Sequence, residues 1–179
     1  RAKLLGRAGA PALGVSLKVT EDGEICARSN HVLKGYWSQP EATNEAIRDG
    51  WFHTGDGGYV DEDNYVTIAD RKKDVIISGG ENVSSIEVED VLFAHEQVTE
   101  VAVIGVPDEK WGETVKALVV IEGEISEEEL IEFCRTKLAH YKCPTSIEFR
   151  DELARTATGK LQKYKLRAPY WEGHEKLVN

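Results

Sequence analysis

Three residues lie in stretches of sequence that could bind a ligand. Asp56 follows Thr-Gly and precedes Gly-Gly, so its carboxylate can approach a sugar closely and accept hydrogen bonds from two adjacent hydroxyls. Arg71 offers a planar donor fork that could hold the same sugar, or could form an exposed ion pair with Asp70 or Asp74, which would contribute little. Lys160 follows Thr-Gly, in a loop that could deliver an ammonium to developing negative charge, or it is an ordinary surface lysine.

The stretch from Asp70 to Asn82 is the element around which these residues are arranged. Its first five residues are charged, and unpaired charges are costly to bury. A short β-branched run then predicts a strand. Gly79 and Gly80 predict a tight turn or a close approach of the backbone to a ligand. Taken alone, the charged block favours a solvated connection between two strands.

Composition limits the classes of function. The chain has 179 residues, is 41% hydrophobic and carries a net charge of −10, which argues against a nucleic-acid-binding protein. No apolar run is long enough to span a membrane and no secretory signal is visible. Cys26, Cys134 and Cys143 lack paired metal-ligand spacing, so we expect reduced thiols, no metal site and a cytoplasmic protein. The absence of methionine indicates a chain that is processed, excised or partly represented.

The pattern of apolar residues predicts an α+β protein with two regions. Residues 1–69 contain short strands and turns, and are too open to close a good core alone. In residues 75–179, Ser84 with Glu87 and Ser126 with Glu129 have capping-box spacing, which predicts two helices. Strands are expected at 98–106 (ended by a proline), 115–121 and 147–149. The predicted order is hairpin, helix, strand, strand, helix, strand.

Three stretches taken together resemble the AMP-forming acyl-CoA synthetases, a family of adenylate-forming enzymes that includes luciferases and peptide-synthetase adenylation domains. The stretches are Gly50-Trp-Phe-His-Thr-Gly-Asp56, the charged block with its glycine pair, and Thr156-Ala-Thr-Gly-Lys160. The resemblance implies that residues 1–69 are the β-rich end of a large ATP- and substrate-binding domain and that residues 70–74 are a hinge. It implies that residues 75–179 are a small lid domain with a three-stranded sheet, helices and a hairpin.

The resemblance also implies roles for individual residues. Asp56 and Arg71 would bind the ribose of ATP and AMP, Lys73 would be the hinge residue, and Lys160 would stabilise the charge that develops as the adenylate forms. Six further positions would line the path of CoA: Gly79, Gly80, Glu81, Trp111, Tyr141 and Lys142.

Two departures from the family pattern affect these roles. Some relatives carry basic residues for the CoA phosphates at the positions of Cys143 and Thr145, so Lys142 is the nearest candidate here. Relatives also usually have proline where Ala154 stands, so the loop before Lys160 is expected to be less rigid.

The implied reaction joins a carboxylic acid to CoA, with ATP converted to AMP and pyrophosphate through an acyl-adenylate. The Gly-Gly-Glu-Asn-Val stretch resembles that of the CoA ligases. The segment 166–171 resembles that of their fatty-acyl members, the long- or medium-chain fatty-acid–CoA ligases. The family's phosphate loop, magnesium ligands and acyl pocket would lie upstream, in the N-terminal domain of the same protein, and we expect the chain alone to be inactive. A ligase that loads a carrier protein and a non-catalytic interaction module derived from the lid are the alternatives.

Overall fold

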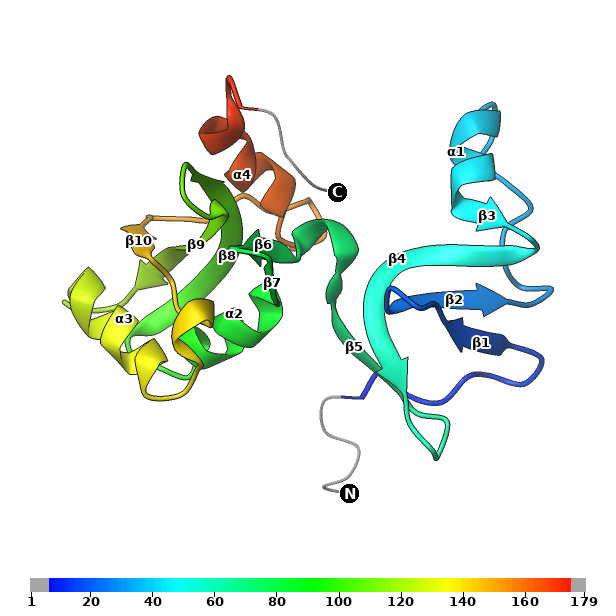
Figure 1. Ribbon diagram of the computed structural model, residues 1–179, viewed down its shortest axis with the longest axis horizontal. Helices are drawn as coiled ribbons and strands as arrows, with labels where there is room; N and C mark the ends of the chain where they lie inside the picture. The colour runs from blue at the N-terminus through cyan, green and yellow to red at the C-terminus, as the bar shows by residue number, and fades with distance from the viewer. Residues whose placement is uncertain (1–6, 175–179) are drawn as a thin grey trace. The chain divides into compact units, whose positions relative to one another are not determined.

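The computed structural model describes residues 7–174 and divides the chain into two compact units, residues 1–73 and 74–179. Each unit is built on its own sheet (Figure 1). The first unit contains β1 (Ser16–Val19), β2 (Glu24–Arg28), α1 (Pro40–Ala46), β3 (Ile47–Arg48), β4 (Trp51–Val60) and β5 (Val66–Arg71). The sequence predicts a short helix near residues 44–47, but α1 begins earlier, at Pro40, because the fixed φ of proline suits the first helical turn.

Strand β4 is the long, curved centre of the first sheet (Figure 1). Its first residues pair with β2 and β3, and residues 56–60 pair with β5, all antiparallel. The register shifts between Gly57 and Gly58, where a Cβ at Gly58 would collide with the carbonyl oxygen of Thr67. Glycine therefore lets β4 bend there and serve different partners along its length.

The first unit has a thin core. Among its described residues, Ile25 and Cys26 are the buried hydrophobic side chains, while Leu13 and Trp37 are almost fully exposed. Glu24 and Asp70 are buried polar residues of the same unit. The short strands thus enclose little apolar volume, as the sequence predicted.

The second unit follows the predicted element order and adds a C-terminal helix. It contains β6 (Ile76–Ser78), β7 (Glu81–Val83), α2 (Ser85–Phe93), β8 (Val98–Asp108), β9 (Gly112–Ile121), α3 (Glu127–Arg135), β10 (Ser146–Phe149) and α4 (Lys163–Trp171). Strand β9 pairs with β8 and with β10, which gives the expected three-stranded sheet. The β6–β7 hairpin joins this sheet through one pair, Ser78 with Gly112, so the complete sheet has five strands. The predicted α+β fold class is confirmed.

Both faces of the second sheet are covered. Val101 and Val103 of β8 belong to the core under α2 and α3, whereas Ala102 and Ile104 belong to the core under α4. The uninterrupted apolar run of β8 is therefore buried on alternate sides, as a strand covered by helices on both faces requires. Figure 1 shows α2 and α3 side by side and α4 apart from them.

Two predicted boundaries in this unit were wrong. Strand β8 continues through Pro107 to Asp108. Among the strands of residues 7–174, β8 pairs with β9 alone, and an edge strand tolerates a residue without an N–H. The sequence predicts that the helix capped by Ser84 runs to about His95, whereas α2 ends at Phe93. Ser126 and Glu129 form a complete capping box, while Ser84 caps α2 and the carboxylate of Glu87 binds Lys142 instead.

Candidate functional site

The first site is a pocket of about 320 Å³ that gathers residues singled out in the sequence. Thr54, Gly55 and Asp56 of β4 line one part, and residues 71–73 line the other. Asp56 and Arg71 are register partners across β4 and β5, with Arg71 Nε 3.6 Å from Asp56 Oδ1. Both side chains remain accessible, at 34% and 60% of their full exposure. The arrangement offers a carboxylate acceptor and a guanidinium donor to one polar ligand.

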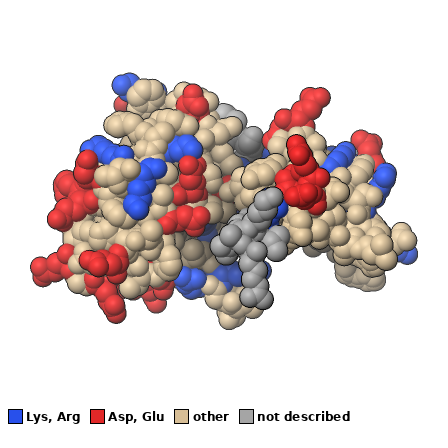
Figure 2. Space-filling model, turned by 90° about the horizontal axis from the view of Figure 1, so that it is seen from below, with Lys and Arg blue, Asp and Glu red and all other residues tan. Residues whose placement is uncertain are grey.

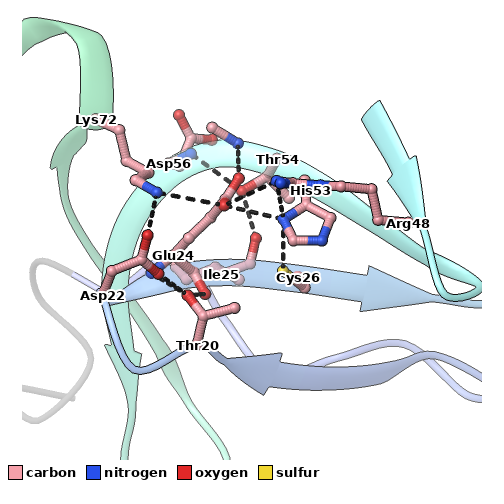
Figure 3. A network of polar contacts seen from close by, with 11 residues as sticks. Thr20, Asp22, Glu24, Ile25, Cys26, Arg48, His53, Thr54, Asp56 and Lys72 are labelled. Atoms are coloured by element: carbon pink, nitrogen blue, oxygen red, sulfur yellow. Dashed lines mark hydrogen bonds and ion pairs between the residues drawn. The ribbon is translucent and has the colours of Figure 1, made fainter. Parts of the chain in front are cut away.

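A buried carboxylate supports this pocket from beneath (Figure 3). Glu24 Oε1 accepts a hydrogen bond of 2.9 Å from the backbone N–H of Gly55, next to Asp56. Glu24 Oε2 lies 3.0 Å from His53 Nδ1 and 3.5 Å from the ammonium of Lys72. Burial raises the pKa of Glu24, but the bonds from His53 and Gly55 and the charge of Lys72 together leave that pKa below its ordinary value.

Lys72, within the predicted hinge, forms ion pairs with two acidic residues of the first unit. Its ammonium binds Asp22 at 2.5 Å, and this bond is the main reason that the pKa of Asp22 falls to about 2. The first two residues of the predicted hinge 70–74 lie in β5 and pair with β4. Lys72–Asp74 form a 3₁₀ turn at the boundary of the two units. The role of Lys73 as the hinge stays a prediction.

The second site is a pocket of about 720 Å³ in the second unit, between the β8–β9 turn and the end of α4. Gly79, which adjoins it, donates a backbone hydrogen bond of 2.9 Å to Trp111 O, and a Cβ there would lie 2.7 Å from the Trp111 ring. Both glycines of the pair have positive φ, +60° and +87°. The lining includes Ile77, Gly80, Pro107, Trp111, Lys116 and Trp171. The structure thus brings Gly79, Gly80 and Trp111 together.

The other residues predicted for the CoA path do not line this pocket in the described part of the chain. Glu81 is exposed on β7. Tyr141 is half exposed, and Lys142 binds Glu87 with distances of 2.7 and 2.8 Å, both from the 3₁₀ turn His140–Lys142. The bond to Glu87 raises the pKa of Lys142. Their assignment to a CoA path stays a prediction.

Lys160 sits on a loop held by its own polar contacts. The N–H of Thr156 donates to Lys160 O at 2.8 Å, and the N–H of Lys160 donates to Thr156 Oγ1 at 3.1 Å. Arg155 donates to Gly159 O and pairs with Glu100 of β8 at 2.6 Å, which ties the loop to the sheet. These contacts hold the loop in place, and the lower rigidity expected from Ala154 stays a prediction. The Lys160 side chain is exposed and pairs with no described residue.

The residues that support the first pocket and the Lys160 loop were not predicted to do so. Lys163 at the start of α4 bridges Ser85 and Glu89 of α2 at 2.6 and 2.7 Å, and thereby anchors the loop that ends at Lys160. Glu24 and His53 support the first pocket. Such residues could have been sought in the sequence as a glutamate or lysine inside a segment whose other residues pack against the core.

The surface carries mixed charge. On the face shown in Figure 2, acidic and basic side chains are interspersed without a continuous basic stripe. Across the described residues, no helix is both long and apolar enough to cross a membrane.

Comparison with known proteins agrees with this geometry. Residues 87–160 match the AMP-binding enzyme C-terminal domain. Over 150 residues the chain is 49% identical to the long-chain-fatty-acid–CoA ligase FadD13 of Mycobacterium tuberculosis (strain ATCC 25618 / H37Rv), covering 83% of this chain and 30% of that protein. Over 172 residues it is 44% identical to 2-succinylbenzoate–CoA ligase of Bacillus mycoides (strain KBAB4), covering 91% and 36%.

A solved structure shows the same likeness. The crystal structure of ATP-bound MatB from Rhodopseudomonas palustris superimposes with a TM-score of 0.88 at 39% identity, covering 95% of this chain and 37% of that one. The chain spans about a third of the length of the relatives it matches. The matched domain, the similar sequences and the shared fold agree, and the chain belongs to the AMP-binding, adenylate-forming enzyme family.

Proposed function

We propose that the chain acts as the C-terminal part of an ATP-dependent carboxylate–CoA ligase. The observation that carries the proposal is the exposed Lys160 ammonium at the end of a braced loop, in a chain whose relatives are CoA ligases. The enzyme would join a carboxylic acid to the α-phosphate of ATP, release pyrophosphate, and then transfer the acyl group to CoA. The adenylate intermediate divides one difficult displacement into two easier ones.

In the first half-reaction, Asp56 would accept hydrogen bonds from the two ribose hydroxyls while Arg71 donates to the sugar. Lys160 would bridge the substrate carboxylate and the α-phosphate, whose negative charges are forced together as the bond forms. Magnesium would accompany ATP and would be held by residues of the large domain, upstream of this chain.

In the second half-reaction, the second unit would turn about Lys73, withdraw Lys160 and present Gly79 and Gly80 to the pantetheine arm. The glycine backbone, with Trp111 against it, leaves room that a side chain would occupy. For the acid we propose a fatty acid, because FadD13 is a long-chain-fatty-acid–CoA ligase. Relatives that act on 2-succinylbenzoate make an aromatic acid the alternative.

The first experiment separates the two half-reactions in the full-length enzyme. Lys160→Ala should slow adenylate formation, measured by pyrophosphate exchange, by about 10²–10³-fold, the usual effect of losing one preorganised charge contact. Thioester formation from synthetic acyl-adenylate should be largely spared. Lys165→Ala, on the exposed side of α4, is the matched control and should change neither rate. If the chain were only an interaction module, Lys160→Ala would change neither rate of the full-length enzyme.

The second experiment concerns the hinge. Lys73→Pro should preserve adenylation and block thioester formation, because proline fixes φ and removes a donor at the residue that must rotate. Lys73→Ala, which keeps φ free, should spare both steps. If Lys160→Ala and Lys73→Pro lost the same half-reaction, the two-conformation mechanism would have to be abandoned.

One observation favours a second acceptor, the pantetheine arm of a carrier protein. Cys143 is buried and Thr145 is uncharged, so neither supplies a positive charge for the nucleotide phosphates that distinguish CoA from a carrier. Thioester yields with CoA and with a pantetheine-loaded carrier protein, measured at equal concentrations, decide between the two. A strong preference for the carrier would replace the CoA assignment.

A further inference from the structure

Three side chains of types that can bind a metal ion lie close together beneath the first pocket (Figure 3). Cys26 on β2 and His53 on β4 are register partners, and Glu24 stands two residues before Cys26 on the same face of its strand. Their ligand atoms all lie within 4.8 Å of one another. Glu24 and Cys26 are buried, at 5% and 0% exposure. Sequence spacing did not reveal this group, because His53 comes from a different strand.

The distances suit a tetrahedral cation. Cys26 Sγ lies 3.4 Å from His53 Nδ1, and Glu24 Oε2 lies 3.0 Å from the same nitrogen. A Zn²⁺ ion with bonds of about 2.3 Å to sulfur and about 2.0 Å to nitrogen or oxygen separates its ligand atoms by roughly 3.3–3.6 Å. Small side-chain adjustments would therefore place all three atoms around one ion.

The existing partners of His53 conflict with one another. Arg48 approaches Nδ1 to 2.8 Å and can only donate, so this contact needs a bare nitrogen lone pair. The carboxylate of Glu24 faces the same atom and can only accept, so that contact needs an N–H. Both demands cannot be met at once. A cation would remove the conflict, because it binds the lone pairs of nitrogen and oxygen together.

The surroundings leave room for this change. The Arg48 side chain is 56% exposed and can turn into solvent. Glu24 can keep its Oε1 bond to Gly55, since only Oε2 faces the histidine. Lys72, 3.5 Å from Oε2, keeps its shorter bond to Asp22.

We propose that Glu24, Cys26 and His53 bind a thiophilic divalent cation such as Zn²⁺, with the fourth position open to water. The Cys26 thiol would release its proton to solvent as the sulfur–metal bond forms. The carboxylate and the thiolate balance the two charges of the ion. Metal binding here needs none of the ligase substrates, although His53 lies on β4, the strand that carries Asp56.

Cobalt reports the site directly. Co²⁺ added to the untagged, reduced 179-residue chain should give a thiolate-to-metal absorption band in the near ultraviolet and visible bands of tetrahedral cobalt. Zn²⁺ should displace both. Cys26→Ser, which is close in volume, should abolish the near-ultraviolet band, whereas Cys143→Ser in the second unit should retain it. His53→Ala should weaken Co²⁺ binding by more than roughly tenfold, since even outer-shell partners cost that much.

A variant that is expected to strengthen Co²⁺ binding distinguishes loss of the site from loss of folding, because an unfolded variant could not bind more tightly. Arg48→Gln removes the competing guanidinium and its positive charge from the neighbourhood of Nδ1 and should tighten Co²⁺ binding. No thiolate band at millimolar Co²⁺, a band that survives Cys26→Ser, or weaker binding in a folded Arg48→Gln variant would each overturn the proposal.

Discussion

At the scale of single residues, Gly79 is positioned by both its backbone and its neighbour. Its φ is +60°, and a Cβ would lie 2.7 Å from the ring of Trp111. Gly80 has φ of +87°, but a Cβ there would meet no atom within 4 Å. The two glycines therefore separate the cost of the left-handed backbone from the cost of a steric collision.

Alanine at these two positions tests the separation. Gly79→Ala and Gly80→Ala should each lose about 1–2 kcal/mol of unfolding free energy, the cost of a left-handed alanine. Only Gly79→Ala should also displace Trp111, whose ring is about half exposed and can move. Urea unfolding measures the first effect, and near-ultraviolet circular dichroism of the tryptophans reports the second. Equal spectral changes in both variants would contradict this account of the Gly79–Trp111 contact.

The candidate site was predictable where its residues lie close together in sequence. Asp56 and Lys160 were found because glycine and threonine beside them are visible in the sequence. Glu24 and His53 were not found, because their contact depends on the register between β2 and β4 and on a bulge that shifts it. A register of that kind is fixed by long-range packing, which residue spacing does not encode.

At the scale of elements, α4 depends on tertiary contacts more than on its own sequence. It begins without a side-chain cap and contains Pro169, so its local pattern is weak, and the helix was not predicted. Burial of Leu166, a 2.9 Å bond from Trp171 Nε1 to Gly105 O, and the bond from Tyr170 to Glu148 hold it on the sheet. By contrast the start of α3, with its complete capping box, was predicted from Ser126 and Glu129.

The contact between Tyr170 and Glu148 makes the docking of α4 sensitive to acid. The hydrogen bond from Tyr170, with Arg150 and Lys116 nearby, holds the pKa of Glu148 below its ordinary value of 4.5. A carboxyl with a lowered pKa stabilises the fold above its ordinary pKa, and that contribution is lost as pH falls through the folded value. The second unit should therefore lose stability below about pH 4.5 partly through Glu148.

Urea midpoints between pH 7 and pH 3 measure this effect. Glu148→Gln, which cannot ionise, should have a lower midpoint at pH 7 and a flatter fall toward pH 3. Glu128→Gln on the exposed side of α3 is the control and should follow the wild-type curve. If Glu148→Gln and Glu128→Gln gave parallel curves, the Tyr170–Glu148 bond would not contribute to the acid sensitivity.

At the scale of the whole molecule, the two units bury very different amounts of apolar side chain. The second unit has two clusters, one under α2 and α3 and one under α4. Among the described residues of the first unit, Ile25 and Cys26 alone are buried hydrophobic residues. Caps and apolar runs made the second unit predictable as an α+β fold. The strand pairing of the first unit was less predictable, because β4 changes partners along its length.

This difference predicts unequal stability along the chain. Amides of β8 and β9 should be the most protected in hydrogen exchange, because these strands pair over ten positions and are covered on both faces. Amides of β1 and β3 should exchange much faster, since both are short edge strands over a thin core. Residues 74–179 expressed alone should unfold cooperatively in urea with the protection pattern they show in the full chain. Equal protection of β1 and β9 in the monomeric chain, or failure of residues 74–179 to fold, would show that the two units stabilise each other as a single cooperative structure.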